Sequence, residues 1–173
     1  AEGDFGRESS IDFYVDGELF YCHKDDLHPD LVGNAAVHFE NNLMKTVTIW
    51  LPYSKEVLIR ALNISDGAKF QTIPPRPQKL IFFGDSITQG VGTTLASAGY
   101  AMQTAIQLES YEVINQGIGS WVFNEGSLDE ECKYDTDVII IAYGTNDWSQ
   151  KTKLQYKQDM RNYLDKLIKI YPK

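Results

Sequence analysis

The pattern of hydrophobic and polar residues changes once along the chain, at a short proline-rich stretch. Before this stretch, apolar and polar residues alternate with the period of two that is typical of half-buried β-strands. The alternation predicts four strands, with an Asp-Gly pair suited to a β-hairpin turn between the first two; they cover residues 11–15, 18–21, 46–51 and 57–62. We therefore predict a small antiparallel β-sandwich over residues 1–73.

Residues 74–78 are predicted to form a stiff, extended connector. The closely spaced prolines in this segment fix their own φ and keep the residues before them extended. After it, continuous apolar segments alternate with segments of helical spacing. The predicted strands cover residues 80–83, 111–115 and 138–142, and the predicted helices lie near 101–108 and 160–171. Alternating strands and helices favour a parallel sheet with right-handed crossovers. Residues 79–173 are therefore predicted to form an α/β domain.

Side-chain spacing adds detail to the two helices. Ser97 is a suitable residue to cap the first helix. The last helix carries one apolar stripe, formed by Met160, Leu164, Leu167, Ile168 and Tyr171. Its other positions hold a run of basic residues, which we interpret as a solvated helix face and not as a binding patch; they are Lys151, Lys153, Lys157, Arg161, Lys166 and Lys169.

Composition and charge argue against several classes of protein. The 173 residues carry a formal net charge of −8, which disfavours a nucleic-acid partner because phosphate contacts need a basic surface. The longest apolar run covers residues 138–143, far short of the ~20 residues that span a bilayer, so we predict no membrane span. The two cysteines, Cys22 and Cys132, have no metal-binding spacing, and we predict two unpaired thiols.

Small and polar residues gather in the three loops that follow the predicted parallel strands; these are residues 84–90 (GDSITQG), 115–120 (NQGIGS) and 143–147 (YGTND). Such loops emerge at the carboxyl edge of the sheet, where ligands bind in open α/β folds. The Ser86 hydroxyl is a candidate nucleophile. Its own N–H, backbone N–H groups near Gly119 and the Asn146 amide are candidate donors to an oxyanion. Asp85 and Asp147 fit structural hydrogen-bonding roles better than the role of an acid.

These loops resemble the sequence blocks of the GDSL or SGNH hydrolase superfamily, which comprises serine esterases and acylhydrolases with a flavodoxin-like α/β/α sandwich. The resemblance implies that Ser86 is the nucleophile and an oxyanion donor, and that Asn146 completes the oxyanion hole. The family's second block has a glycine where this chain has Ser120, directly after Gly119, so the backbone donor is one of these two. The similarity covers residues 79–171, roughly the first half of such a domain.

The residues before the connector look like the sandwich domains that precede the hydrolase in some carbohydrate esterases. The resemblance implies removal of a short acyl group, such as acetyl, from a small-molecule or carbohydrate ester, without a metal or cofactor. It also favours a secreted or periplasmic protein. Trp121 and Trp148 follow the second and third loops and are candidates for the walls of an acyl or sugar pocket, or for ordinary packing.

Two other functions compete with this one as interpretations of the same residues. A non-catalytic carbohydrate-binding or adhesion module, built on the β-rich part and its aromatic residues, is the main alternative. A nucleotide-binding function fits less well, because residues 84–92 lack the G-x-G-x-x-G spacing of a dinucleotide site. Loss of ester cleavage on substitution of Ser86 would separate the enzyme from both alternatives.

The general base is missing from its expected place. In the family an Asp-x-x-His block near the C-terminus supplies it, but no histidine follows Ser86 in this chain. Asp25 and His28 have the same spacing before the nucleophile, and we interpret them as part of a surface turn and not as the base. The last predicted strand also leaves an open apolar edge. We therefore expect the chain to be a fragment of a longer enzyme that is close to inactive on its own.

Overall fold

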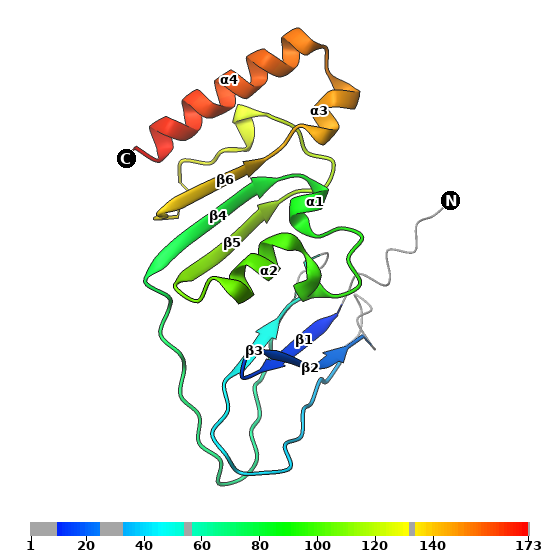
Figure 1. The fold of residues 1–173 in the computed structure, drawn as a ribbon, viewed down its shortest axis with the longest axis vertical. Coiled ribbons are helices and arrows are strands. Elements are labelled where there is room, and N and C mark those ends of the chain that lie inside the picture. Colours follow the sequence, from blue (N-terminus) through cyan, green and yellow to red (C-terminus); the bar gives the residue numbers. More distant parts are fainter. Residues whose placement is uncertain (1–9, 25–32, 54–56, 132–133, 173) are drawn as a thin grey trace, which may run out of the picture.

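Two separate β-sheets form the framework of the molecule (Figure 1). The computed structural model describes residues 10–24, 33–53, 57–131 and 134–172. Within them, the first sheet is antiparallel with the strand order β2-β1-β3, and the second is parallel with the order β5-β4-β6. The antiparallel sheet precedes the parallel sheet in the chain, as the change in hydrophobic pattern predicts.

The antiparallel sheet consists of β1 (Ile11–Val15), β2 (Glu18–His23) and β3 (Val47–Trp50). Between β1 and β2, Asp16 and Gly17 both have positive φ, 52° and 90°, as a tight turn between twisted strands requires. The predicted hairpin and the small antiparallel sheet are therefore present. A second sheet packed against it, which a sandwich needs, is not found among the described residues.

The prediction of a strand at residues 57–62 is wrong. Residues 57–77 form turns and irregular backbone, and the side chains of Leu58 and Ile59 are 79% and 62% exposed. Alternating apolar residues stabilise a strand only when a neighbouring strand accepts its hydrogen bonds and another layer covers its apolar face. In the described part of the chain this segment has neither.

The parallel sheet consists of β4 (Gln78–Gly84), β5 (Tyr111–Gly117) and β6 (Val138–Ala142). All three predicted strands are confirmed, and β6 lies at an edge of the sheet. Gly84 at the end of β4 pairs with Gly117 of β5 and with Ala142 of β6. The three strands therefore end at the same level, and the loops that follow them start from one edge of the sheet.

Helices cover both faces of the parallel sheet, which gives the three layers of the predicted flavodoxin-like fold (Figure 1). On one face α2 (Tyr100–Gln107) packs on β4 and β5, and on the other α4 (Lys153–Ile170) packs on β4 and β6. The shorter helical segments are α1 (Ser86–Gln89), η2 (Ala96–Ala98), η3 (Glu125–Ser127) and α3 (Thr145–Gln150). None of the described helices is both long enough and apolar enough to cross a bilayer.

α4 begins earlier than the predicted helix, and four of the five residues of the predicted apolar stripe pack against the core. Tyr163 and Ile170 are 0% and 6% exposed, whereas Ile168, which the predicted stripe includes, is 66% exposed. The face that meets the sheet follows steps of three and four residues, from Met160 through Tyr163 and Leu167 to Ile170. Ile168 lies off this face, because a step of one residue from Leu167 rotates the side chain by about 100° around the helix axis.

Buried hydrogen bonds join the antiparallel sheet to the segment before α2. Asp12 Oδ2 accepts from the backbone N–H of Ser97 at 2.8 Å, and Ser10 Oγ accepts from the preceding backbone N–H, also at 2.8 Å. Ser10, Asp12 and Ser97 are each 0% exposed. The prediction that Ser97 caps α2 is wrong, because its N–H is bound to Asp12 and its hydroxyl accepts from Tyr14. α2 starts without a side-chain cap.

Candidate active site

Ser86 is the first residue of α1 and directly follows a turn that Asp85 stabilises. The Asp85 side chain is 1% exposed, and its Oδ1 accepts from the backbone N–H of Ile87 at 2.9 Å, which caps the helix. Asp85 thus has a structural hydrogen-bonding role. Ser86 is partly exposed, and no hydrogen bond to another described residue engages its hydroxyl. The start of α1 therefore carries an available hydroxyl at the carboxyl edge of the sheet.

The loop after β5 lies against Ser86 because the end of the strand packs closely on α1. A Cβ at Gly117 would overlap the backbone nitrogen of Gln89, so only glycine fits there. Two residues later, a Cβ built at Gly119 would lie 4.0 Å from Ser86 Cβ and 3.1 Å from Gln89 Oε1. A side chain at this position would therefore contact Ser86, so the loop at Gly119 lies beside the candidate nucleophile.

Ser120 stands where the resembled family has a glycine, and its backbone has a conformation that glycine adopts easily. Its φ is +62°, in the left-handed region. The N–H of Trp121 donates to the carbonyl oxygen of Ile118 at 3.2 Å, which closes a turn around Gly119 and Ser120. A positive φ at the third residue is what a type II turn requires. The serine therefore keeps the shape of the loop that a glycine would adopt with less strain.

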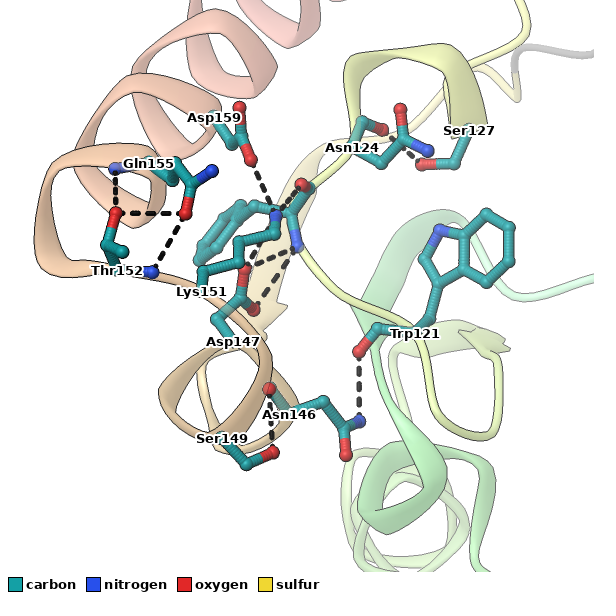
Figure 2. A network of polar contacts seen from close by, with 11 residues as sticks. Trp121, Asn124, Ser127, Asn146, Asp147, Ser149, Lys151, Thr152, Gln155 and Asp159 are labelled. Atoms are coloured by element: carbon teal, nitrogen blue, oxygen red, sulfur yellow. Dashed lines mark hydrogen bonds and ion pairs between the residues drawn. The ribbon is translucent and has the colours of Figure 1, made fainter.

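The third loop brings Asn146 to the loop after β5. Gly144 has a φ of +128°, which lets the chain turn sharply from β6 into α3. The Asn146 amide donates from Nδ2 to the carbonyl oxygen of Trp121 at 2.9 Å (Figure 2). Nδ2 carries a second hydrogen, which no described residue accepts. The second and third loops are thus joined two residues from Gly119.

The two candidate pocket tryptophans lie in different surroundings. Trp121 is partly buried, and its indole Nε1 is buried without a hydrogen-bond partner in the described part of the chain. Trp148 lies on α3 and is 91% exposed. Trp121 is therefore held beside the second loop, while Trp148 is exposed at the surface of the described structure.

A cluster of charged side chains lies where α3, α4 and the loop after β5 meet (Figure 2). Asp147 is 0% exposed and accepts the N–H of Phe123 with both carboxylate oxygens, at 3.1 and 3.2 Å. Lys151 Nζ lies 3.0 Å from Asp147 Oδ1 and 2.8 Å from Asp159 Oδ2. The prediction that Lys151 lies on a solvated face is wrong, because its side chain is only 14% exposed. The sequence does contain one signal for this ion pair: Asp147 and Lys151 are four residues apart, a spacing that brings opposite charges together on a helix.

The titration of two groups near the site follows from their surroundings. Burial lowers the pKa of Lys151, but hydrogen bonds with Asp159 and Asp147 outweigh it, so the net shift of this pKa is upward. Burial raises the pKa of Tyr143, and the nearby hydroxyl of Tyr163 offsets this only in part. With pKa values above their ordinary ones, neither Lys151 nor Tyr143 is a base for Ser86 near neutral pH.

The described histidines lie outside the three loops. His23 ends β2 and is 8% exposed, and His38 is an exposed residue between β2 and β3. Asp25 and His28 lie outside the described residues. Among the residues that are described, no group of three or more His, Cys, Asp or Glu side chains is arranged to hold a metal ion.

The model of the GDSL-like lipase/acylhydrolase family matches residues 82–173, which is more than half of the chain. The chain therefore belongs to this family, and the resemblance of its loops to the GDSL or SGNH blocks is confirmed. Comparison with curated protein sequences gives no match.

Solved structures share the fold beyond the region that the family model covers. Salicylyl-acyltransferase SsfX3 from a tetracycline biosynthetic pathway has a TM-score of 0.66 at 19% identity, over 99% of this chain and 49% of that one. A family two carbohydrate esterase from Cellvibrio japonicus has a TM-score of 0.64 at 20% identity, over 96% and 61% of the two chains. One from Clostridium thermocellum, in complex with cellohexaose, has a TM-score of 0.59 at 18% identity, over 96% and 62%. At these identities the likeness shows the fold, and the chain spans about half to three fifths of the length of the structures it matches.

Proposed function

We propose that the chain is the part of a serine esterase that carries the nucleophile and the oxyanion hole. The main support is the convergence of three loops. Gly119 approaches Ser86, and Asn146 donates to Trp121 in the same loop as Gly119. Membership of the GDSL-like lipase/acylhydrolase family supports the class of reaction.

In the proposed reaction, Ser86 Oγ attacks the carbonyl carbon of the ester, and its proton passes to a general base. The carbonyl oxygen becomes an oxyanion. It accepts from the N–H of Ser86, from the N–H of Gly119 or Ser120, and from the second N–H of Asn146 Nδ2. The base then protonates the leaving alcohol, and the acyl group remains on Ser86. Water, activated by the same base, hydrolyses this acyl-enzyme and releases the acid.

The general base in this proposal is a histidine from sequence outside this chain. No histidine follows Ser86 in the sequence, and His23 and His38 lie in the part that precedes the parallel sheet. A serine hydroxyl without a base is a poor nucleophile. The 173-residue chain alone is therefore expected to act several orders of magnitude more slowly than a polypeptide that includes the base.

The proposed substrate is an ester of a short acyl group, with an acetylated carbohydrate as the first candidate. The two carbohydrate esterases share the fold over 96% of this chain, antiparallel part included. In this proposal residues 1–73 form an accessory β domain, residues 74–78 a connector and residues 79–173 the hydrolase domain. Trp121 and Trp148 are proposed to wall the acyl or sugar pocket.

Ester hydrolysis by a polypeptide that includes this chain and the base tests the proposal. With p-nitrophenyl acetate or an acetylated oligosaccharide, Ser86→Ala is expected to lower kcat by several orders of magnitude. Ser110→Ala is the matched control, because Ser110 precedes β5 at the opposite edge of the sheet, and kcat and KM should not change. Equal activity of Ser86→Ala and the wild type overturns the proposal. If such a variant still binds the oligosaccharide, the non-catalytic carbohydrate-binding module is favoured instead.

A further inference from the structure

Lys151 contacts three different parts of the chain with its ammonium group (Figure 2). It donates to the carbonyl oxygen of Phe123 at 2.6 Å in the loop after β5. It also pairs with Asp147 on α3 at 3.0 Å and with Asp159 on α4 at 2.8 Å. An ammonium group has three N–H donors, so these partners use all of them. Lys151 therefore has no donor left for an anionic ligand. We look for its role in the contacts by which it joins these three parts of the chain.

The backbone of Phe123 is held from both sides by this cluster. Its N–H donates to the two oxygens of Asp147, and its carbonyl oxygen accepts from Lys151. The Phe123 side chain is 6% exposed, and its ring packs edge-on against three tyrosines, Tyr143, Tyr156 and Tyr163. The backbone bonds and the buried ring together restrain this point of the loop strongly.

The same cluster restrains Asn146. Asn146 and Asp147 are consecutive residues in the first turn of α3. Asp147 binds the backbone of Phe123, while Asn146 donates to the carbonyl oxygen of Trp121, two residues earlier. The two neighbours thus hold the loop at two nearby points. Gly119 and Ser120 directly precede Trp121, so these contacts also determine where the candidate backbone donors lie.

α4 anchors the cluster on the side away from the loop. Thr152, directly after Lys151, caps α4 in a capping box with Gln155, which defines where this helix starts (Figure 2). Asp159, farther along α4, supplies the second carboxylate. The ammonium of Lys151 is therefore fixed by a helix whose start is itself capped.

We propose that Lys151 is a positioning residue for the oxyanion hole: by bridging Phe123, Asp147 and Asp159, it holds the loop after β5 at a fixed distance from Asn146. This inference rests on the proposed function, in which a backbone N–H of that loop and the Asn146 amide bind the same oxygen. Donors are most effective when they are fixed before the charge develops. A displacement of about 1 Å costs on the order of 10²-fold in rate.

Amide hydrogen exchange in the 173-residue chain tests this role without a need for catalysis. Lys151→Met removes the charge and the donors but keeps the length of the side chain. We expect exchange at the Phe123 and Trp121 amides to become at least about tenfold faster, and the side-chain amide signals of Asn146 to shift, while β4 is unchanged. Lys157→Met, at an exposed position of α4, is the matched control and should behave as the wild type. Unchanged exchange at Phe123 and Trp121 in Lys151→Met overturns the proposal.

A double variant separates positioning from folding. Lys151→Met leaves the buried carboxylate of Asp147 without its nearest cation, which by itself destabilises a fold. Asp147→Asn combined with Lys151→Met removes both charges and keeps an acceptor for the N–H of Phe123, but leaves its carbonyl oxygen without the ammonium. We expect this variant to unfold cooperatively, as the wild type does, and still to show faster exchange at Trp121. Wild-type exchange at Trp121 in the double variant contradicts the proposal.

Kinetics distinguish failure of this inference from failure of the proposed function. In a polypeptide that includes the base, Lys151→Met is expected to lower kcat by about 10- to 100-fold and to change KM by less than about twofold. Lys157→Met should leave both constants unchanged. If exchange becomes faster but kcat does not fall, Lys151 is a structural residue only and the positioning role is wrong. If the wild type hydrolyses no ester, the proposed function fails, and the exchange measurement still decides whether Lys151 holds the loop.

Discussion

Asn146 donates a hydrogen bond from its side-chain amide to the carbonyl oxygen of Trp121, at 2.9 Å. This bond joins the loop after β6 to the loop after β5, and Gly119 of the latter loop approaches Ser86 in the loop after β4. The three loops meet because the strands before them end in register. A candidate nucleophile and several candidate hydrogen-bond donors are thus brought together from distant parts of the sequence, which is the arrangement that the proposed ester hydrolysis requires.

Asn146→Ala is expected to remove one donor to the oxyanion together with the bond to Trp121. In a polypeptide that includes the base, kcat for p-nitrophenyl acetate should fall by about 10²- to 10³-fold, the usual effect of losing one such donor, with little change in KM. Gln150→Ala, at an exposed position of α3, is the control and should have wild-type kinetics. A rise in KM with kcat unchanged would mean that Asn146 binds the substrate without stabilising the oxyanion.

Ser120 is predicted to be replaceable by glycine but not by a β-branched residue, because its φ is +62°. The left-handed conformation costs a non-glycine residue about 1–2 kcal/mol, and glycine adds about 0.4–1 kcal/mol of unfolded-state entropy. The free energy of unfolding of Ser120→Gly should therefore equal or slightly exceed that of the wild type. Ser120→Val should lose at least about 1 kcal/mol. Chemical denaturation measures the order, and a valine variant as stable as the wild type would contradict the left-handed turn.

Asp12→Ala is expected to destabilise the junction between the two sheets. The substitution leaves the buried N–H of Ser97 without its acceptor, at a cost of about 1–3 kcal/mol. Glu18→Ala, at an exposed position of β2, should change the free energy of unfolding by less than about 0.5 kcal/mol. If denaturation of the two variants shows the same stability, the bond from Asp12 does not hold the sheets together.

Cys22, a free thiol in the structure, is expected to react slowly with alkylating reagents near neutral pH. Burial raises the pKa of this thiol, and the nearby Asp12 carboxylate raises it further. A thiol with a raised pKa has less of the reactive thiolate at a given pH below that pKa. In a Cys132→Ser background, the alkylation rate should rise with pH to a midpoint above that of the denatured chain, and Asp12→Asn should lower this midpoint. Identical midpoints in the folded and denatured chains would show that neither burial nor Asp12 affects the thiol.

The parts of the fold that local pattern alone determines could be predicted from the sequence. The wholly apolar segment of β6 indicates a strand of the parallel sheet, and Asp16 and Gly17 suit the one turn that tolerates positive φ at both residues. The coverage of both faces that such a segment also indicates is wrong for β6, because Val138 and Ile140 are 39% and 37% exposed. The positions of Ser86 and Asn146 at one sheet edge follow from the parallel order of the strands. The strand expected at residues 57–62 fails because pairing depends on a neighbour, which periodicity does not report.

Lys151 could not be placed from the sequence for a similar reason. A lysine in a basic run is usually solvated, and only the folded positions of Asp147 and Phe123 make this one a buried bridge. Ser97 has the side chain of a helix cap, but Asp12 and Tyr14 occupy its polar groups from the other sheet. In each case a contact between distant segments overrides a preference that is correct locally.

Covalent labelling with a serine-directed fluorophosphonate gives a direct test of Ser86 as the nucleophile in the folded oxyanion site. The 173-residue chain is expected to react slowly and to react faster when imidazole is added as a base. Peptide mass mapping should place a single adduct on Ser86, Ser86→Ala should form none, and Ser110→Ala should react as the wild type. An adduct on another residue, or equal labelling of Ser86→Ala and the wild type, would contradict the proposed nucleophile.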